Sequence, residues 1–435
     1  MSNRSSRSGK PISGPLYLPA LDGLRGLALL MIVFFHLAFA VEHHPGAPTL
    51  PQQTEEAASR LASVPDPLHF YFGSTNYFLA FFFILSGFVL FLPIAAKGEF
   101  GSIRSFAIRR LFRMIPAFYV SLLILLILIP TVFDPDVLPG YDALGIFSHL
   151  TFTHQEFSAP GFGINGALWT VSIDAVFYLI LPLIAVWYFR HPFIGLGIGL
   201  ALGVAWQLIT VVPASTEVTP TTAGALKLFV QFPLFADEHA LGMTAAWVVV
   251  RMMREKESLA RRLAPALALG FLALSLGLMY WSSSQAKLLT VFNPPLFFTL
   301  AVPVAMTVCL IGTVFLSSRA AWILTNPVAR WIGDTSYSAY LYHGIVLVFV
   351  FAWLDINVAE ELPLALAVYI PGVALCGWVS FTLVERPART VGHRIARRYS
   401  KRGSAKQPPV AVPAHPAEGP PPLAARGASG PAGGG

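Results

Sequence analysis

The sequence has 435 residues, of which 55% are hydrophobic and only 12% are charged. These shares exclude an ordinary soluble domain, in which about a quarter of the residues are charged, and they predict an integral membrane protein. The formal net charge of +7 does not indicate a nucleic-acid partner, because the basic residues lie in short clusters between apolar runs and form no recognisable nucleic-acid module.

The apolar runs predict an all-α, polytopic bundle of about ten transmembrane helices, since roughly 20 helical residues cross the hydrocarbon core of a bilayer. We therefore expect a multi-pass protein of the inner (plasma) membrane. The expected spans are residues 21–41, 70–94, 112–132, 168–189, 193–213, 225–250, 263–282, 293–317, 331–353 and 363–384.

The placement of Lys and Arg predicts the orientation, because positively charged loops beside a span stay in the cytoplasm. Basic loops around Arg104, Arg190, Arg254 and Arg330 alternate with segments that are rich in Asp and Glu. This alternation predicts an even number of spans, with both termini in the cytoplasm.

The chain divides into three parts by composition. Residues 1–16 form a basic tail, residues 17–390 form the transmembrane domain, and residues 391–435 are first basic and then rich in Pro, Gly and Ala. From about residue 403 the last part is too poor in large apolar side chains to fold alone, so we expect it to end in a disordered cytoplasmic tail.

Residues 1–40 also have the pattern of a secretory signal peptide, with basic residues before an apolar run that ends in Ala-Phe-Ala. Cleavage there would remove both Arg25 and His36, so we favour an uncleaved first span.

The first span, LDGLRGLALLMIVFFHL, carries Arg25 near one end and His36 near the other. Their spacing of eleven residues places them on one helix face, about 16 Å apart along the axis. As structural residues they would be an interfacial anchor and an inter-helix hydrogen bond. Ionisable groups at this depth usually face a bundle interior, which favours a functional site.

The segment SIRSFAIRRLFRMIPAFY precedes the third span and contains Arg109, Arg110 and Arg113. Arg110 and Arg113 share a helix face at a spacing of three residues, and guanidinium groups match phosphate oxygens. The segment is compatible with contacts to anionic lipid or with a clamp for a phosphorylated cytoplasmic donor.

Further polar side chains fall within predicted spans. They occur in the motifs LSGF, LWTVSIDAVFYLILP, FPLFADEHALGM and GDTSYSAYLYH. Several ionisable groups at membrane depth predict a shared site. The candidates are Ser86, Trp169, Ser172, Asp174, Glu238, His239, Tyr337, Tyr340 and His343.

The remaining histidines do not predict a metal site. His43, His44, His69, His149 and His154 follow no ligand spacing that a metal would require. We expect them to be solvent-exposed loop residues, and we predict no metal cofactor.

The order of these motifs resembles acyltransferase family 3, the integral-membrane O-acyltransferases that modify surface polysaccharides, lipids and secondary metabolites. The resemblance covers roughly residues 17–390. It rests on LDGLRGLALLMIVFFH, FFFILSGFVL, FAIRRLFRMIPAFY, ALWTVSIDAVFYLILPL, GDTSYSAYLYH and LVERP. One position departs from the pattern, since Asp174 stands where the family commonly has Glu.

The resemblance implies transfer of an acyl group, most simply acetyl, from cytoplasmic acyl-CoA to a hydroxyl of a carbohydrate, glycolipid or related acceptor. It implies His36 as general base, a role that suits a neutral imidazole. It further implies that Arg25, Arg109, Arg110 and Arg113 bind the donor.

The resemblance also implies that Asp174 and Glu385 are catalytic carboxylates. For Glu385 it leaves two roles open, an ion pair or a partner of the catalytic imidazole. The bilayer and a glycan or lipid-linked acceptor are the expected partners, with separate glycan-assembly proteins completing delivery.

A proton-coupled secondary transporter is the alternative function, because intramembrane Asp, Glu and His also relay protons in carriers. A transporter of this kind is often built from inverted repeats and broken helices. The sequence has no such symmetry, so we favour the enzyme.

Overall fold

The computed structural model describes residues 18–42, 75–131, 141–154, 164–165, 168–216, 231–284, 296–350, 354 and 361–404. Within these ranges the chain forms helices and turns and no strand, as the all-α prediction requires. The α-helices are α1 (Ala20–Glu42), α4 (Thr75–Lys97), α5 (Ile103–Leu128), α6 (Ala143–Leu150), α8 (Trp169–Arg190), α9 (Pro192–Thr216), α11 (Ala236–Glu255), α12 (Glu257–Pro265), α13 (Phe271–Ser284), α14 (Leu296–Val314), α15 (Trp322–Thr325), α16 (Pro327–Val348), α17 (Leu362–Ser380) and α18 (Arg386–Ser404).

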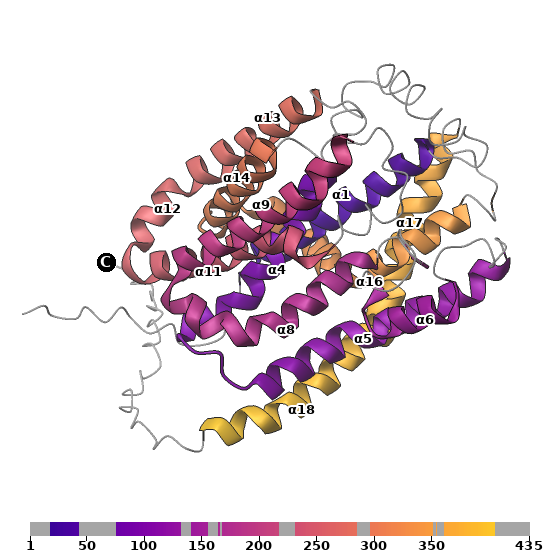
Figure 1. Ribbon diagram of the computed structural model, residues 1–435, viewed down its shortest axis with the longest axis horizontal. Coiled ribbons are helices and arrows are strands. Elements are labelled where there is room, and N and C mark those ends of the chain that lie inside the picture. The colour runs from indigo at the N-terminus through magenta and orange to yellow at the C-terminus, as the bar shows by residue number, and fades with distance from the viewer. Residues whose placement is uncertain are drawn as a thin grey trace, which may run out of the picture.

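The helices form a bundle in which α4, α11 and α16 lie inside and the others surround them (Figure 1). Helices α5 and α18 run side by side along one edge, and α12 and α13 follow the opposite edge. The two edges leave many large apolar side chains exposed, among them Leu123 on α5 and Leu272 on α13. Such surfaces suit contact with lipid.

Eight stretches of the described chain are long and apolar enough to cross a membrane. They are Ala20–Leu37, Tyr77–Lys97, Ile103–Leu128, Trp169–Arg190, Pro192–Ile209, Glu257–Ser282, Phe297–Val314 and Pro363–Tyr399. The expected spans at 225–250 and 331–353 correspond to α11 and α16, which are not among the eight. Both helices carry buried polar groups that face protein rather than lipid.

The chain remains helical beyond the last predicted span. A π-helical turn at Phe381–Glu385 joins α17 to α18, which ends at Ser404 and packs along α5. Residues 391–404, the basic first part of the predicted tail, are therefore helical, and this helix ends close to residue 403, where the sequence analysis expects disorder to begin. The remainder of that tail and the basic residues 1–16 lie outside the described residues.

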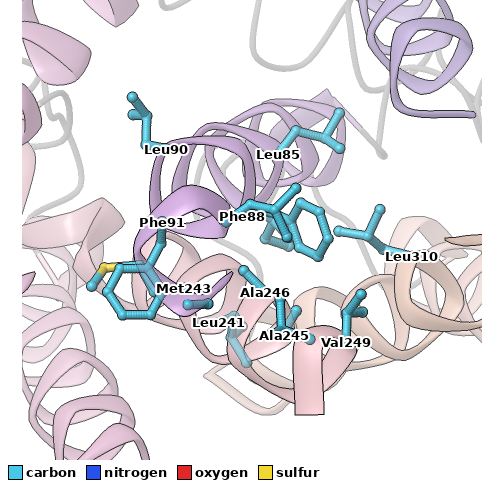
Figure 2. Close-up of a cluster of buried hydrophobic side chains, with 14 of the residues drawn as sticks. Leu85, Phe88, Leu90, Phe91, Leu241, Met243, Ala245, Ala246, Val249 and Leu310 are labelled. Atoms are coloured by element: carbon cyan, nitrogen blue, oxygen red, sulfur yellow. The ribbon is translucent and has the colours of Figure 1, made fainter. Parts of the chain in front are cut away.

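Helix α4 packs most extensively against α11, and this contact is the centre of the fold. Phe88 and Phe91 of α4 lie against Met243 and Ala246 of α11, with Leu310 of α14 closing the cluster (Figure 2). Two glycines allow the backbones to approach: a Cβ at Gly87 would overlap the carbonyl oxygen of His239, and one at Gly242 would overlap that of Ile84. Small residues serve this purpose in membrane helix pairs generally.

Helix α1 meets α15 and α16 through the same device. A Cβ at Gly23 would overlap the backbone of Leu324, and one at Gly333 would overlap the carbonyl oxygen of Asp22. The close approach aligns the face of α1 that carries Arg25 and His36 with α16.

We expect Gly242→Ala to lower the melting temperature of the detergent-solubilised protein. The added methyl group has no room between α11 and α4, and overpacking of this kind costs about 1–3 kcal/mol. The matched control is Gly197→Ala on α9, where an added Cβ meets no atom within 4 Å. Equal melting temperatures for both variants and the wild type would contradict the role of Gly242.

Candidate active site

A cavity lies between α1, α4, α5, α8 and α16, and its lining is strongly basic. Among the described residues, three arginines and a single carboxylate face it. Its polar lining residues are Arg25, Ser86, Arg110, Arg113, Thr170, Asp174, Tyr178, Ser336, Tyr337 and Tyr340. A cavity with more guanidinium than carboxylate groups suits an anionic ligand.

The cavity brings together seven of the residues singled out in the sequence, although they come from five helices. They are Arg25, Ser86, Arg110, Arg113, Asp174, Tyr337 and Tyr340.

The arginines on α5 separate according to helical periodicity. Arg110 and Arg113 line the cavity, whereas Arg109 is exposed, donates to the Ser105 hydroxyl and is not part of the lining. The Arg110 guanidinium lies 5.7 Å from the ring centroids of both Phe106 and Tyr178. Cation-π contact with these rings orients the group while leaving its N–H donors available.

Arg25 enters the cavity from α1. Its Nη1 atom lies 3.4 Å from Oδ1 of Asp22, one helical turn earlier. The ion pair is long and partly exposed, so it compensates the charge of Arg25 only weakly.

Asp174 of α8 is held between α4 and α11. The Ser86 hydroxyl donates to its Oδ1 atom at 2.8 Å, and Nε2 of His239 lies 3.6 Å from the same oxygen. Gly87 packs directly on the His239 backbone. The Ser-Gly pair therefore has two functions, a hydrogen bond to the carboxylate and a close helix contact that brings His239 to it.

His36 does not line the cavity and instead contacts His343 of α16. The two ring centroids are 4.6 Å apart, and Nδ1 of His36 lies 3.2 Å from Nε2 of His343. The His343 ring also contacts Tyr340, with 5.2 Å between centroids, and Tyr340 lines the cavity. One aromatic side chain thus connects the basic cavity with the histidine pair.

Comparison with known families assigns the whole of this region to one family. The model of an acyltransferase domain matches residues 18–381, which contain the cavity, the histidine pair and the helices that hold them. The chain belongs to acyltransferase family 3. Residues 18–381 are therefore an acyltransferase domain, as the order of the motifs predicts.

Three relatives are similar over most of the chain. The peptidoglycan O-acetyltransferase OatA of Listeria monocytogenes is 24% identical over 400 residues, covering 86% of this chain and 56% of the relative. The putative peptidoglycan O-acetyltransferase YrhL of Bacillus subtilis is 24% identical, covering 87% and 56%. Nodulation protein 10 of Rhizobium leguminosarum is 25% identical, covering 74% and 84%.

The chain spans little more than half the length of the two peptidoglycan O-acetyltransferases. No solved structure matches the chain.

Three other candidate residues of the acyltransferase lie outside the cavity lining. Trp169 packs against Phe83 and Phe235, and Ser172 is hydrogen-bonded to His154. Glu238 is buried, and its Oε2 atom has no hydrogen-bond partner in the described part of the chain. Trp169 and Ser172 support the start of α8, which carries Asp174 two residues later.

Glu385 forms the ion pair that was one of its two predicted roles. It is almost fully buried, accepts a hydrogen bond from Ser338 at 2.8 Å and lies 3.4 Å from Nη1 of Arg389. It therefore joins α16 to the start of α18 and does not contact the imidazole of His36.

Tyr178 and Arg389 were missed in the sequence, and helical spacing would have found both. Tyr178 follows Asp174 by four residues and lines the same cavity. Arg389 follows Glu385 by four residues. Residues at this spacing are neighbours on a helix surface.

The prediction that His149 and His154 are solvent-exposed is wrong. Both are buried, with their rings stacked at 4.2 Å beside Ser172 of α8. Burial lowers the pKa of His149, and burial together with the nearby His149 lowers the pKa of His154 to about 3. Both rings are neutral at physiological pH, so the α6 segment docks as an uncharged unit.

We expect acid to loosen this segment. Below the ordinary pKa of 6.5 a histidine in the unfolded chain binds a proton, whereas buried His154 does not. The free energy of unfolding therefore decreases as pH falls from 6.5 towards 3. The loss reaches about 2 kcal/mol at pH 5. The difference in melting temperature between pH 7.5 and pH 5 should be smaller for His154→Gln than for the wild type, and unchanged for the exposed control His191→Gln. An identical difference in all three proteins would refute the assignment.

Proposed function

We propose that this protein transfers an acyl group, most simply acetyl, from acyl-CoA on the cytoplasmic side of the plasma membrane to a hydroxyl of a carbohydrate, glycolipid or related acceptor. The observation that carries the proposal is the basic cavity of three arginines beside the His36–His343 pair. The cavity supplies a place for an anionic donor, and the pair supplies a base.

The donor end of the site rests on charge. Arg110 and Arg113 face the cavity together, and planar guanidinium forks hold phosphate oxygens in two hydrogen bonds each. Arg25 shares α1 with His36, eleven residues away, which corresponds to about 16 Å along the axis. An extended pantetheine arm is of comparable length, so phosphates held at the arginines would leave the thioester near His36.

The chemistry follows from the acceptor, since a hydroxyl is a weak nucleophile. As its oxygen forms a bond to the thioester carbonyl carbon, its proton passes to a neutral ring nitrogen of His36. The tetrahedral oxyanion then collapses, the carbon–sulfur bond breaks, and the proton passes from His36 to the leaving CoA thiolate. The products are the ester and CoA, and His36 returns to its neutral form.

The acceptor class rests on the relatives. Two of them are named as peptidoglycan O-acetyltransferases, which supports a glycan hydroxyl as the acceptor here. The basic loops support an orientation with both termini in the cytoplasm. Glycan-assembly proteins are the partners that we propose for presenting the acceptor.

The role of His36 is tested by His36→Ala in isolated membranes, with transfer of label from acetyl-CoA to membrane material as the readout. Loss of a general base typically lowers the rate by about 10²- to 10⁴-fold. The control, His191→Ala, removes an exposed histidine from the end of α8. Wild-type transfer by His36→Ala would show that another group is the base.

The donor clamp is tested by Arg110→Gln and Arg113→Gln. Each change removes charged hydrogen bonds worth about 1.5–3 kcal/mol, so the KM for acetyl-CoA should rise at least tenfold while kcat changes less. Arg104→Gln is the matched control, because this exposed arginine lies on α5 outside the cavity.

CoA alone should raise the melting temperatures of the wild type and of Arg104→Gln more than those of Arg110→Gln and Arg113→Gln. An unchanged KM and equal stabilisation would reject the clamp, and a wild type that CoA does not stabilise would favour the transporter.

A further inference from the structure

The contacts of the two histidine rings fix where their protons are. Nδ1 of His343 lies at the carbonyl oxygen of Tyr340, and Nδ1 of His36 lies 2.9 Å from the carbonyl oxygen of Ile32. A carbonyl oxygen only accepts, so both Nδ1 atoms carry a proton. In a neutral imidazole the other ring nitrogen is then an acceptor.

The donor and the acceptor of the hydrogen bond between the two rings are therefore defined. Nε2 of His343 is the acceptor, and it faces Nδ1–H of His36 at 3.2 Å. The Nδ1 proton of His36 is therefore shared between the Ile32 carbonyl and His343. Nε2 of His36 is left with its lone pair and takes no part in this network.

We infer that His343 is a positioning residue, whose Nε2 atom holds the proton of His36 on Nδ1 and thereby makes Nε2 of His36 the basic nitrogen. The inference rests on the proposed function of His36 as general base. His343 occupies the place that a carboxylate has in a Ser-His-Asp triad, where the third group fixes the tautomer and steadies the imidazolium. Here that group is neutral.

A neutral partner suits this position. Within the described chain, no carboxylate contacts either ring, and Glu385 is engaged by Ser338 and Arg389. His343 is fully buried, and its own Nδ1–H is held by Tyr340, so its Nε2 lone pair is aimed at His36. When His36 gains a proton from the hydroxyl that receives the acyl group, the hydrogen bond from Nδ1–H of His36 to this lone pair strengthens without a second buried charge.

The position of His343 next to Tyr340 connects the histidine pair with donor binding. Tyr340 lines the cavity, shares a hydrogen bond with Thr170 at 2.7 Å and contacts the His343 ring. The orientation of His36 is thus tied to the helix that forms one wall of the cavity. Because Tyr340 is held by Thr170 and His343 itself does not line the cavity, changes at His343 should affect the chemical step more than donor binding.

Two substitutions that replace His343 by an amide side chain test its two hydrogen bonds separately. In His343→Gln the amide oxygen reaches the place of Nε2, which preserves an acceptor for His36 and loses the bond to Tyr340. In His343→Asn the amide nitrogen takes the place of Nδ1, which preserves the bond to Tyr340 and loses the acceptor. His343→Leu loses both, and Tyr342→Phe is the control on the same helix.

We expect kcat to fall about 10- to 100-fold in His343→Leu and His343→Asn, by analogy with the loss of a partner that orients a metal-binding imidazole. His343→Gln should recover most of kcat, and the KM for acetyl-CoA should change little in all variants. Melting temperatures measured in parallel identify any variant that loses its fold.

The inference is overturned if His343→Asn retains kcat while His343→Gln loses it, since the bond to Tyr340 would then be what matters. It is also overturned if folded His343→Leu has wild-type kcat. Both results leave the role of His36 intact, because that role fails only if His36→Ala remains active.

Discussion

The structure depends on the contact between α4 and α11, where two backbones meet through Gly87 and Gly242. Lipid tails are as apolar as leucine side chains, so helices in a membrane associate through close packing rather than through removal of apolar surface from water. This packing places Ser86 on one side of the contact and His239 on the other, with Asp174 between them. The helix contact that holds the bundle together therefore also organises one wall of the cavity.

The cavity carries an electrostatic cost that the fold only partly offsets. Arg25 has a long ion pair with Asp22, and Arg110 lies over two aromatic rings. Asp174 is the one carboxylate among the described lining residues. Such an excess of guanidinium over carboxylate groups suits an anionic ligand, since intramembrane charge is expensive unless it is paired.

The site has two parts that differ in polarity and role. The basic cavity lies on one side, the neutral His36–His343 pair lies on the other, and α1 and α16 contribute to both. Gly23 and Gly333 hold these two helices close together. A shift of α1 against α16 would separate Arg25 from the cavity and His36 from His343 at the same time, so the proposed donor site and the proposed basic nitrogen depend on one helix contact.

The sequence by itself determined the helical membrane fold, the family, and the residues whose spacing on a single helix puts them on one face. Arg110 and Arg113 are the clearest case, because a period of 3.6 residues is a local property. The sequence did not determine the burial of His149 and His154 or the helical state of residues 391–404, since both depend on docking against other helices. The pairing of His36 with His343, 307 residues apart, was decided only by the tertiary structure. Which faces of two helices meet depends on packing along their whole length, and no local pattern records it.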